Sequence, residues 1–354
     1  MAGVFIFTSY IGSGNLTLLM LEKGISADLT RTEAEMCVPK TPLIVVIDWS
    51  GYNIEGPKAY LAEGCLVTRD RSLLNHSQAV LITHGRQRKK DFPKFRRPNQ
   101  RWIWYMDESP YNGFYGHEYG YKAIRDMFNW TMTYRTVSEV HIPYGWTTPR
   151  ETRVPIPSSI GNRSGVAVTV MSNCKSLVHN DRLNYVLELQ KYCGVEIYGR
   201  CGNKICGRYE KGLPMTNCQE VEKFLFYLAF ENSDCKEYIT EKLFSHGFSM
   251  GAVPVVMGAP KADYIAITPP NSFIHVEDFT GPKQLGEYLT FLSKNKTEYM
   301  KYHQWRRDYI TSYRIQYVDD EPVWQALCRA LKLDTGEPKR YTDLAQFWTT
   351  ENCS

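Results

Sequence analysis

The stretch "FYLAFENSDCKEYITEKL", residues 226–243, passes abruptly from strand-like residues to a polar loop. The apolar run from Phe224 to Phe230 predicts a strand inside a sheet, and acidic, amide and hydroxyl side chains follow it at once. In open α/β sheets, ligands bind beyond the carboxyl ends of the strands. The loop at residues 231–242 is therefore the first candidate for a binding site.

Two consecutive β-α-β units surround this loop. The first begins with the strand-like run "GVAVTV", and its helix "RLNYVLELQKY" repeats apolar residues on one face. The predicted strands and helices of both units lie at 165–170, 182–192, 195–199, 224–230, about 240–250 and 252–258. Consecutive units of this kind predict a doubly wound parallel sheet in an α/β protein.

The first half of the chain also alternates short apolar runs with polar connections. The runs "LIVVI" (43–47), "AVLIT" (79–83) and "WIWYM" (102–106) predict strands that are buried on both faces, as in a second parallel sheet. Proline and hydroxyl residues concentrate at 147–165, which predicts a linker between two domains. A length of 354 residues accommodates two domains of ordinary size.

The charges in the 231–242 loop suit a diphosphate joined to a sugar. Lys242 lies in the first turn of the predicted helix, where unpaired N–H groups and the helix dipole already attract an anion. Glu241 can accept paired hydrogen bonds from sugar hydroxyls, and Asn232 and Tyr238 add neutral donors. Arg182 begins the helix of the first unit, and its planar guanidinium suits two phosphate oxygens.

Simpler interpretations exist for these residues. Loops between strands and helices are often polar because they are solvated, and Arg182 could lie on the surface of an amphipathic helix. The sequence contains no Walker loop and no Gly-x-Gly-x-x-Gly motif after a strand. Their absence argues against an ATPase and against a dinucleotide-dependent oxidoreductase.

Composition and cysteine usage favour a globular protein of an oxidising compartment. Ten cysteines predict disulfide bonds, whereas the spacing from Cys201 to Cys206 does not match a zinc knuckle. One cluster consists of Cys193, Cys201, Cys206, Cys218 and Cys235. Asn-x-Ser/Thr sequons agree with a secretory route and lie at Asn15, Asn75, Asn129, Asn162 and Asn295.

The net charge and the hydropathy of the chain limit the kinds of partner that it can bind. The net charge of +4 gives no indication of nucleic-acid binding. The basic run "HGRQRKKDFPKFRRP" (84–98) is interpreted as a solvated loop, with contact to an anionic glycan or a membrane surface as the alternative. Residues 1–21 carry no charge and are long enough to cross a bilayer, but they lack preceding basic residues. The stretch is therefore either an unusual or truncated N-terminus or a poor signal-anchor, and we expect membrane association through the N-terminus.

The segment "FYLAFENSDCKEYITEKLFSHGFSMGAVPVVMGAPKADY" resembles the signature region of the α1,3-fucosyltransferases. The motifs "SFIHVEDFTGPKQLGEYL", "WIWYMDESP", "FNWTMTYR" and "PYG" extend the resemblance over about residues 43–310, and details near 172–202 resemble the invertebrate core-type members. The family implies a GT-B architecture, in which two Rossmann-like domains with parallel sheets face each other across a cleft. It also implies an inverting transfer of L-fucose from GDP-β-L-fucose.

The resemblance assigns residues to the donor. Arg182 and Lys242 would neutralise the diphosphate, while the other residues would hold the ribose and fucose or lie along the nucleotide. The implied GDP-fucose-binding residues are Arg182, Asn232, Tyr238, Glu241, Lys242, Ser172, Asn173 and Tyr198.

A catalytic carboxylate is expected in "MDESP", at the end of the strand 102–106. Inverting transfer needs one general base to take the proton of the acceptor hydroxyl. Side chains alternate across a strand, so Asp107 and Glu108 should face opposite sides, and only one of them can point into the cleft. Resemblance to the family's Glu-Ser-Pro motif selects Glu108; the simpler interpretation is a surface carboxylate at a strand end.

Two further expectations concern departures and metals. Where the family commonly has Asp-Ser-Asp after "NWTMTYR", this chain has Val137, Ser138 and Glu139, which could alter donor or acceptor positioning. The nearest approach to a metal-binding Asp-x-Asp is "VDDEP" (318–322), and we expect no metal ligand there. The reaction is expected to need no cofactor, because Arg182 and Lys242 supply the positive charge, although a divalent cation could stimulate it.

Together these features predict a fucosyltransferase that acts on the 3-hydroxyl of GlcNAc in a glycoprotein glycan, with the N-glycan core favoured. The alternatives are a Lewis-type antenna, a protein hydroxyl, and a catalytically weak glycan-binding relative. The predicted segments are an N-terminal segment at 1–42, an acceptor-side domain at 43–158 and a GDP-fucose-binding domain with C-terminal helices at 159–354. The expected location is the Golgi lumen, as a single-pass type II membrane protein or a soluble lumenal form.

Overall fold

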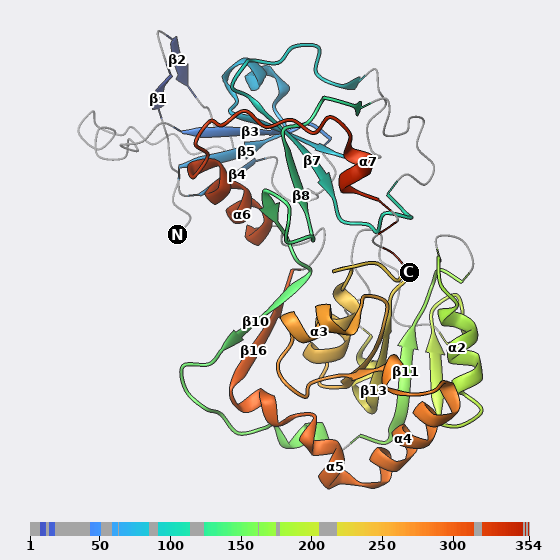
Figure 1. Ribbon diagram of the computed structural model, residues 1–354. Helices are drawn as coiled ribbons and strands as arrows, with labels where there is room; N and C mark the ends of the chain where they lie inside the picture. Colours follow the sequence, from blue (N-terminus) through green and yellow to red (C-terminus); the bar gives the residue numbers. More distant parts are fainter. Residues whose placement is uncertain are drawn as a thin grey trace.

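The computed structural model contains two α/β domains joined by a two-stranded ribbon (Figure 1). It describes residues 8–11, 14–17, 43–50, 59–62, 64–84, 91–113, 124–161, 163–174, 178–204, 218–314, 321–349, 351 and 353. Each domain has a mainly parallel sheet with buried strands, which is the GT-B arrangement that the resemblance implied.

The N-terminal sheet has the strand order β4-β5-β3-β6-β7-β8-β9, in which β4 is antiparallel to β5 and the other pairs are parallel. Its strands are β3 (Ile44–Asp48), β4 (Ala59–Ala62), β5 (Cys65–Thr68), β6 (Ala79–Thr83), β7 (Arg101–Met106), β8 (Trp130–Thr133) and β9 (Val140–His141), with the 3₁₀ helix η1 (Arg71–His76) between β5 and β6. The three strands predicted in this half of the chain are confirmed. Every residue of β7 is buried, because both faces of the sheet are covered.

The C-terminal sheet is entirely parallel, with the order β12-β11-β13-β14-β15. Its strands are β11 (Gly165–Val170), β12 (Val195–Tyr198), β13 (Phe224–Phe230), β14 (Val253–Met257) and β15 (Ile274–His275). Its helices are α2 (Arg182–Leu189), the π-helix η6 (Lys242–Ser249), α3 (Lys261–Ile267), α4 (Pro282–Lys294) and α5 (Lys296–Lys301), with short 3₁₀ turns η4 (Ser158–Gly161), η5 (Gln219–Lys223), η7 (Val276–Asp278) and η8 (Gln304–Arg307). The doubly wound sheet is thus confirmed, while the helix predicted at about 240–250 has π rather than α geometry.

A ribbon of two antiparallel strands, β10 (Gly145–Pro149) and β16 (Tyr309–Tyr313), connects the domains. The start of the predicted linker is therefore a strand. Gly145 allows this ribbon to lie against η6, because a Cβ at this position would come within 2.3 Å of the Phe244 ring. The position of the ribbon is thus tied to the helix that Lys242 begins.

The last part of the chain returns to the N-terminal domain, which differs from the predicted boundary at 159–354. Helix α6 (Glu321–Lys332) packs Trp324 and Leu327 onto the N-terminal sheet, and α7 (Leu344–Phe347) leads to Trp348, whose ring lies 5.3 Å from that of Trp104. Figure 1 shows both helices beside this sheet and the C-terminus at the junction of the domains. Sequence periodicity does not say which sheet a helix covers, so this crossing was not predicted.

Disulfides are present, as the cysteine count predicted. They join Cys65 to Cys328, Cys174 to Cys201, and Cys235 to Cys353. Cys218 is also in a disulfide. The sequence analysis placed Cys193 in the predicted disulfide cluster, and this is wrong for Cys193. It is a free thiol buried in the core beside α2, where burial raises its pKa to about 11.

The expected N-terminal anchor falls mostly outside the described residues, which include the paired strands β1 (Thr8–Ile11) and β2 (Gly14–Thr17) of that stretch. In the described ranges no helix is both long and apolar enough for a membrane span.

The Asn129 sequon cannot accept a glycan in the folded chain. Its side-chain amide is buried, where its oxygen accepts a hydrogen bond from the Trp102 N–H and its nitrogen donates one to the Lys339 carbonyl.

The Cys65–Cys328 bond fastens α6 to β5 across most of the chain. Replacing both cysteines by serine is expected to lower the free energy of unfolding by about 2–5 kcal/mol, because the crosslink restricts the unfolded chain. Urea titration measures this, with Cys193→Ala as the control that removes a cysteine without breaking a disulfide. A loss no larger than that of the control would contradict the assigned role.

Candidate active site

The site is organised by a buried carboxylate at the end of β13. The Glu231 side chain is 1% exposed and accepts hydrogen bonds from the backbone N–H of Thr240 at 2.8 Å and from the Thr240 hydroxyl at 2.9 Å. Lys242 Nζ donates to the second carboxylate oxygen at 2.9 Å. These bonds fold residues 231–242 back onto the strand and fix where η6 begins.

Lys242 is held among oxygen atoms in the first turn of η6. Besides Glu231, its Nζ donates to the Thr240 hydroxyl at 2.8 Å and to the Glu241 carboxylate at 3.1 Å. Burial by itself would lower the pKa of Lys242, but the two carboxylates outweigh it and raise the pKa above its usual value. The lysine therefore stays protonated, and its ammonium group is fixed at the carboxyl edge of the sheet.

Arg182 reaches the same strand end from α2. Its Nη1 donates to the Phe230 carbonyl at 2.9 Å and its Nη2 to the Asn173 carbonyl at 3.1 Å, while its Nε has no hydrogen-bond partner among the described residues. The side chain is 3% exposed, and burial lowers its pKa, although nearby Glu231 opposes that change. Arg182 is thus not a surface residue, and the two cations converge on the consecutive residues Phe230 and Glu231.

Glu108 faces this loop from the other domain. Asp107 turns inward, accepts a hydrogen bond from the Tyr105 hydroxyl at 3.1 Å and lies 3.9 Å from Arg314. Glu108 points the other way, keeps solvent access and accepts a hydrogen bond from the Tyr238 hydroxyl at 3.1 Å. The predicted division between the two carboxylates is confirmed.

The protein around Glu108 raises the pKa of its carboxyl above the ordinary value. The main cause is the protein packed around the carboxyl at the domain junction, which reduces its hydration although part of the side chain still reaches solvent. The like charge of Asp107 raises the pKa further, while Lys242 and the Tyr238 hydrogen bond act in the opposite direction. Once ionised, a carboxylate with a raised pKa is a stronger base than an ordinary glutamate, which suits it to accept a proton.

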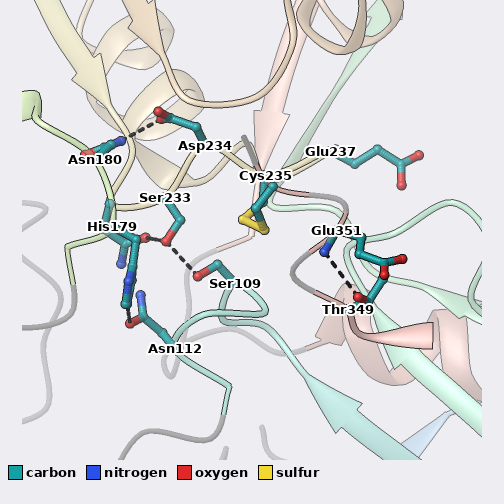
Figure 2. The surroundings of a disulfide bond; sticks show 12 residues. Ser109, Asn112, His179, Asn180, Ser233, Asp234, Cys235, Glu237, Thr349 and Glu351 are labelled. Carbon is teal, nitrogen blue, oxygen red and sulfur yellow. Dashed lines mark hydrogen bonds between the residues drawn. A yellow bond between two sulfur atoms is a disulfide. The ribbon is translucent and has the colours of Figure 1, made fainter. Parts of the chain in front are cut away.

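Direct contacts fix the two domains against each other beside this site (Figure 2). The hydroxyls of Ser109 and Ser233 lie 2.8 Å apart, and Asn112 Oδ1 lies 3.1 Å from the His179 ring nitrogen Nε2. The Cys235–Cys353 disulfide joins the 231–242 loop to the C-terminal segment that packs on the N-terminal domain. The loop and Glu108 therefore belong to one fixed junction.

The remaining predicted residues lie at the carboxyl edge of the C-terminal sheet, at different distances from this junction. Ser172 and Asn173 follow β11, and Asn232 accepts a hydrogen bond at 3.2 Å from its neighbour Ser233. Tyr198 is buried, and its hydroxyl donates to Glu196 of the same strand at 3.2 Å. Its hydroxyl is thus engaged on its own strand, and the proposed contact with nucleotide stays a prediction.

Val137 stands where the family commonly has an aspartate, and its side chain is 59% exposed. The acid that follows it, Glu139, accepts hydrogen bonds from the Thr131 backbone N–H at 2.6 Å and the Tyr341 hydroxyl at 3.0 Å. Glu139 thus supports β8 and the C-terminal segment.

Sequence reasoning missed the residues that support the site from below. The sequence analysis treated Glu231 only as part of a polar loop. An acid directly after an apolar strand, followed by Thr240 nine residues later and Lys242 eleven residues later, could have indicated the buried carboxylate that these two residues bind. Tyr134 was missed as well; its ring lies 5.3 Å from that of Tyr238 and helps to hold the phenol toward Glu108.

In the described parts of the chain no group of three His, Cys, Asp or Glu residues could hold a metal ion.

Comparison with known proteins gives a consistent result. Residues 39–145 match the family described as "Fucosyltransferase, N-terminal", and residues 160–348 match "Glycosyltransferase family 10 (fucosyltransferase) C-term". Alpha-(1,3)-fucosyltransferase 4 of Rattus norvegicus is 31% identical over 88% of this chain and 80% of its own length. The matched region covers 56% of the length of alpha-(1,3)-fucosyltransferase 4 of Mus musculus and 46% of that of Homo sapiens.

Two further similarities concern acceptor chemistry and fold. The 4-galactosyl-N-acetylglucosaminide 3-alpha-L-fucosyltransferase FUT6 of Homo sapiens is 36% identical over 68% of this chain and 65% of its own length. A crystal structure of an alpha1,3-fucosyltransferase has a TM-score of 0.51 at 13% identity, covering 83% of this chain and 91% of the other, which shows a shared fold.

Two Rossmann-like domains that meet at this junction form the GT-B fold of glycosyltransferases. The chain belongs to glycosyltransferase family 10, the fucosyltransferases, and with it to the α1,3-fucosyltransferase enzymes.

The bond between Lys242 and Glu231 predicts a large cost for removing the cation alone. Lys242→Met should lower the free energy of unfolding by about 3–5 kcal/mol, because it leaves a buried carboxylate without its partner. The double variant Lys242→Met with Glu231→Gln should recover much of this loss, since a neutral amide can still accept from Thr240. Urea unfolding of both variants measures the difference, and equal stabilities would show that the pair is not coupled.

Proposed function

We propose that this enzyme transfers L-fucose from GDP-β-L-fucose to the 3-hydroxyl of a GlcNAc residue in a glycoprotein glycan, with inversion at the fucose anomeric carbon. The observation that supports this best is the position of Glu108, which is held by Tyr238 at 3.1 Å opposite the loop that carries Lys242. A base and a cationic leaving-group site on opposite sides of one junction are what a single inverting displacement requires.

The proposed donor site uses fixed charges. Negative charge builds on the departing GDP as the bond from the fucose anomeric carbon to the phosphate oxygen breaks, and preorganised cations stabilise that charge. Lys242 and Arg182 are the proposed partners of the diphosphate, and no metal ion is assigned to this step. Glu241 is 38% exposed beside them and is proposed to accept hydrogen bonds from donor hydroxyls.

The proposed base is Glu108. As the acceptor oxygen bonds to the anomeric carbon, its proton passes to the Glu108 carboxylate, and GDP leaves from the opposite face of the sugar. The Tyr238 hydroxyl keeps the carboxylate in place, since burial raises the pKa of Tyr238 well above its usual value and the phenol remains a donor.

The proposed acceptor is a galactosylated GlcNAc of the antenna type. The name of the human relative, 4-galactosyl-N-acetylglucosaminide 3-alpha-L-fucosyltransferase, supports this class over the N-glycan core that the sequence favoured. We further propose a lumenal location in the Golgi apparatus, which the disulfides support because such bonds persist in oxidising compartments.

Glu108→Gln tests the base. Release of GDP in the presence of N-acetyllactosamine should fall about 100- to 10,000-fold, the usual contribution of a general base, while GDP still binds. The control is Glu237→Gln, which also removes a carboxylate at the domain junction, but one that lies on the loop itself and accepts a hydrogen bond from Arg135 of the other domain. Normal turnover by Glu108→Gln would remove this residue from the reaction.

A glycan panel with the unaltered enzyme tests the acceptor. N-acetyllactosamine should be fucosylated faster than a truncated N-glycan that carries only the core GlcNAc residues. Faster fucosylation of the truncated N-glycan would favour the N-glycan core as the acceptor instead. Binding of GDP-fucose without transfer to any glycan would indicate a binding protein rather than an enzyme.

The pH dependence follows from the raised pKa of Glu108. The base must be ionised, so kcat/KM should fall as the pH drops through this pKa, and the fall should begin at a higher pH than for an ordinary glutamate. Tyr238→Phe removes a hydrogen bond that stabilises the carboxylate, so the acidic limb should move to higher pH. A pH–rate profile measures both effects, and a limb that moves to lower pH or does not move would contradict the assignment.

A further inference from the structure

A cavity of about 520 Å³ lies at the opposite end of the N-terminal sheet, away from Glu108. It opens where β7 and β8 begin, whereas Glu108 follows the other end of β7. Its lining residues are Arg96, Arg97, Pro98, Asn99, Arg101, Asn129, Gly336, Pro338, Lys339 and Arg340. Five of the ten are cations, and none is acidic.

Only part of this positive charge is balanced within the protein. Arg101 forms two hydrogen bonds of 2.7 Å with the Asp334 carboxylate, and Lys339 is paired with Glu139. Arg96, Arg97 and Arg340 have no carboxylate partner among the residues that the structure describes. The cavity therefore holds an excess of positive charge on a concave surface, where counter-charge is attracted most strongly.

Two of the unbalanced arginines are held in place by main-chain oxygens. Arg96 Nη1 donates to the Met127 carbonyl at 2.8 Å, and its guanidinium lies over the Trp102 ring at 5.3 Å. Arg97 Nη1 donates to the Asn75 carbonyl at 2.7 Å. Burial lowers the pKa of Arg96, and the neighbouring charges of Arg340 and Arg101 lower it further. The cations are thus close enough to repel one another, and a bound anion would relieve that repulsion.

We propose that this cavity is a second binding site, which takes a saccharide that bears sulfate esters. The three cations without a carboxylate partner are all arginines, and planar guanidinium groups bind tetrahedral oxyanions through paired hydrogen bonds. The neutral lining of Pro98, Asn99 and Pro338 offers apolar surface and an amide to a sugar ring. A lipid surface is a poorer match, because a flat array of headgroups does not fill a cavity. The proposed site is separate from the proposed donor site, since it shares no residue with the loop at 231–242.

Calorimetric titration of the full chain with a heparin hexasaccharide tests this proposal. The matched ligand is an N-acetylheparosan hexasaccharide, which has the carboxylates but no sulfate, and it should bind at least about tenfold more weakly. Arg340→Glu should weaken heparin binding about tenfold or more, because it removes a charged hydrogen bond and adds repulsion. The Arg340 side chain is exposed and forms no ion pair with any residue that the structure describes, so the variant should unfold at the temperature of the unaltered chain.

Lys283→Glu is the control, because it makes the same charge change on an exposed position of α4 in the other domain. Its affinity for the hexasaccharide should remain within about twofold of the unaltered chain, since exposed charges far apart are screened. Equal losses in Arg340→Glu and Lys283→Glu would overturn the proposal, and so would equal binding of the two hexasaccharides. Binding to vesicles of phosphatidylcholine and phosphatidylserine, with none to the heparin hexasaccharide, would assign the cavity to a membrane surface instead.

Discussion

The structure of the active site depends on the buried carboxylate of Glu231. An ionised group in that position is tolerated only when it is paired and hydrogen-bonded, and here Thr240 and Lys242 supply those bonds. The requirement closes the loop between β13 and η6, because both partners come from the loop's far end. Lys242 is consequently presented at the carboxyl edge of the sheet, where Arg182 also ends.

The same loop forms the junction with the other domain. Cys235 and Tyr238 pack into the apolar cluster of Trp104 and Trp348 in the N-terminal domain, so the loop is part of both domains. The C-terminal segment reinforces this arrangement, because it crosses back to the N-terminal sheet and is bonded to Cys235 through Cys353. The position of Glu108 relative to Lys242 is therefore set by packing and covalent bonds, not by a flexible hinge alone.

Local features of the fold were predictable from sequence. Short apolar runs such as 79–83 and 224–230 gave the strands, and strand alternation separated Asp107 from Glu108. Features that depend on distant residues were not predictable: the packing of α6 on the other domain, the π geometry of η6 and the main-chain bonds of Arg182. The partner of Glu231 also required the folded loop, since a polar residue after a strand is usually only solvated.

A crystal structure of the chain with GDP is the most direct measurement of the central claim. The account predicts a phosphate oxygen within about 3 Å of Lys242 Nζ, with the bond from Lys242 to Glu231 kept and the Glu108 carboxylate facing the same space. A diphosphate bound out of reach of both Lys242 and Arg182, or a Glu108 side chain turned away from the bound nucleotide, would contradict it.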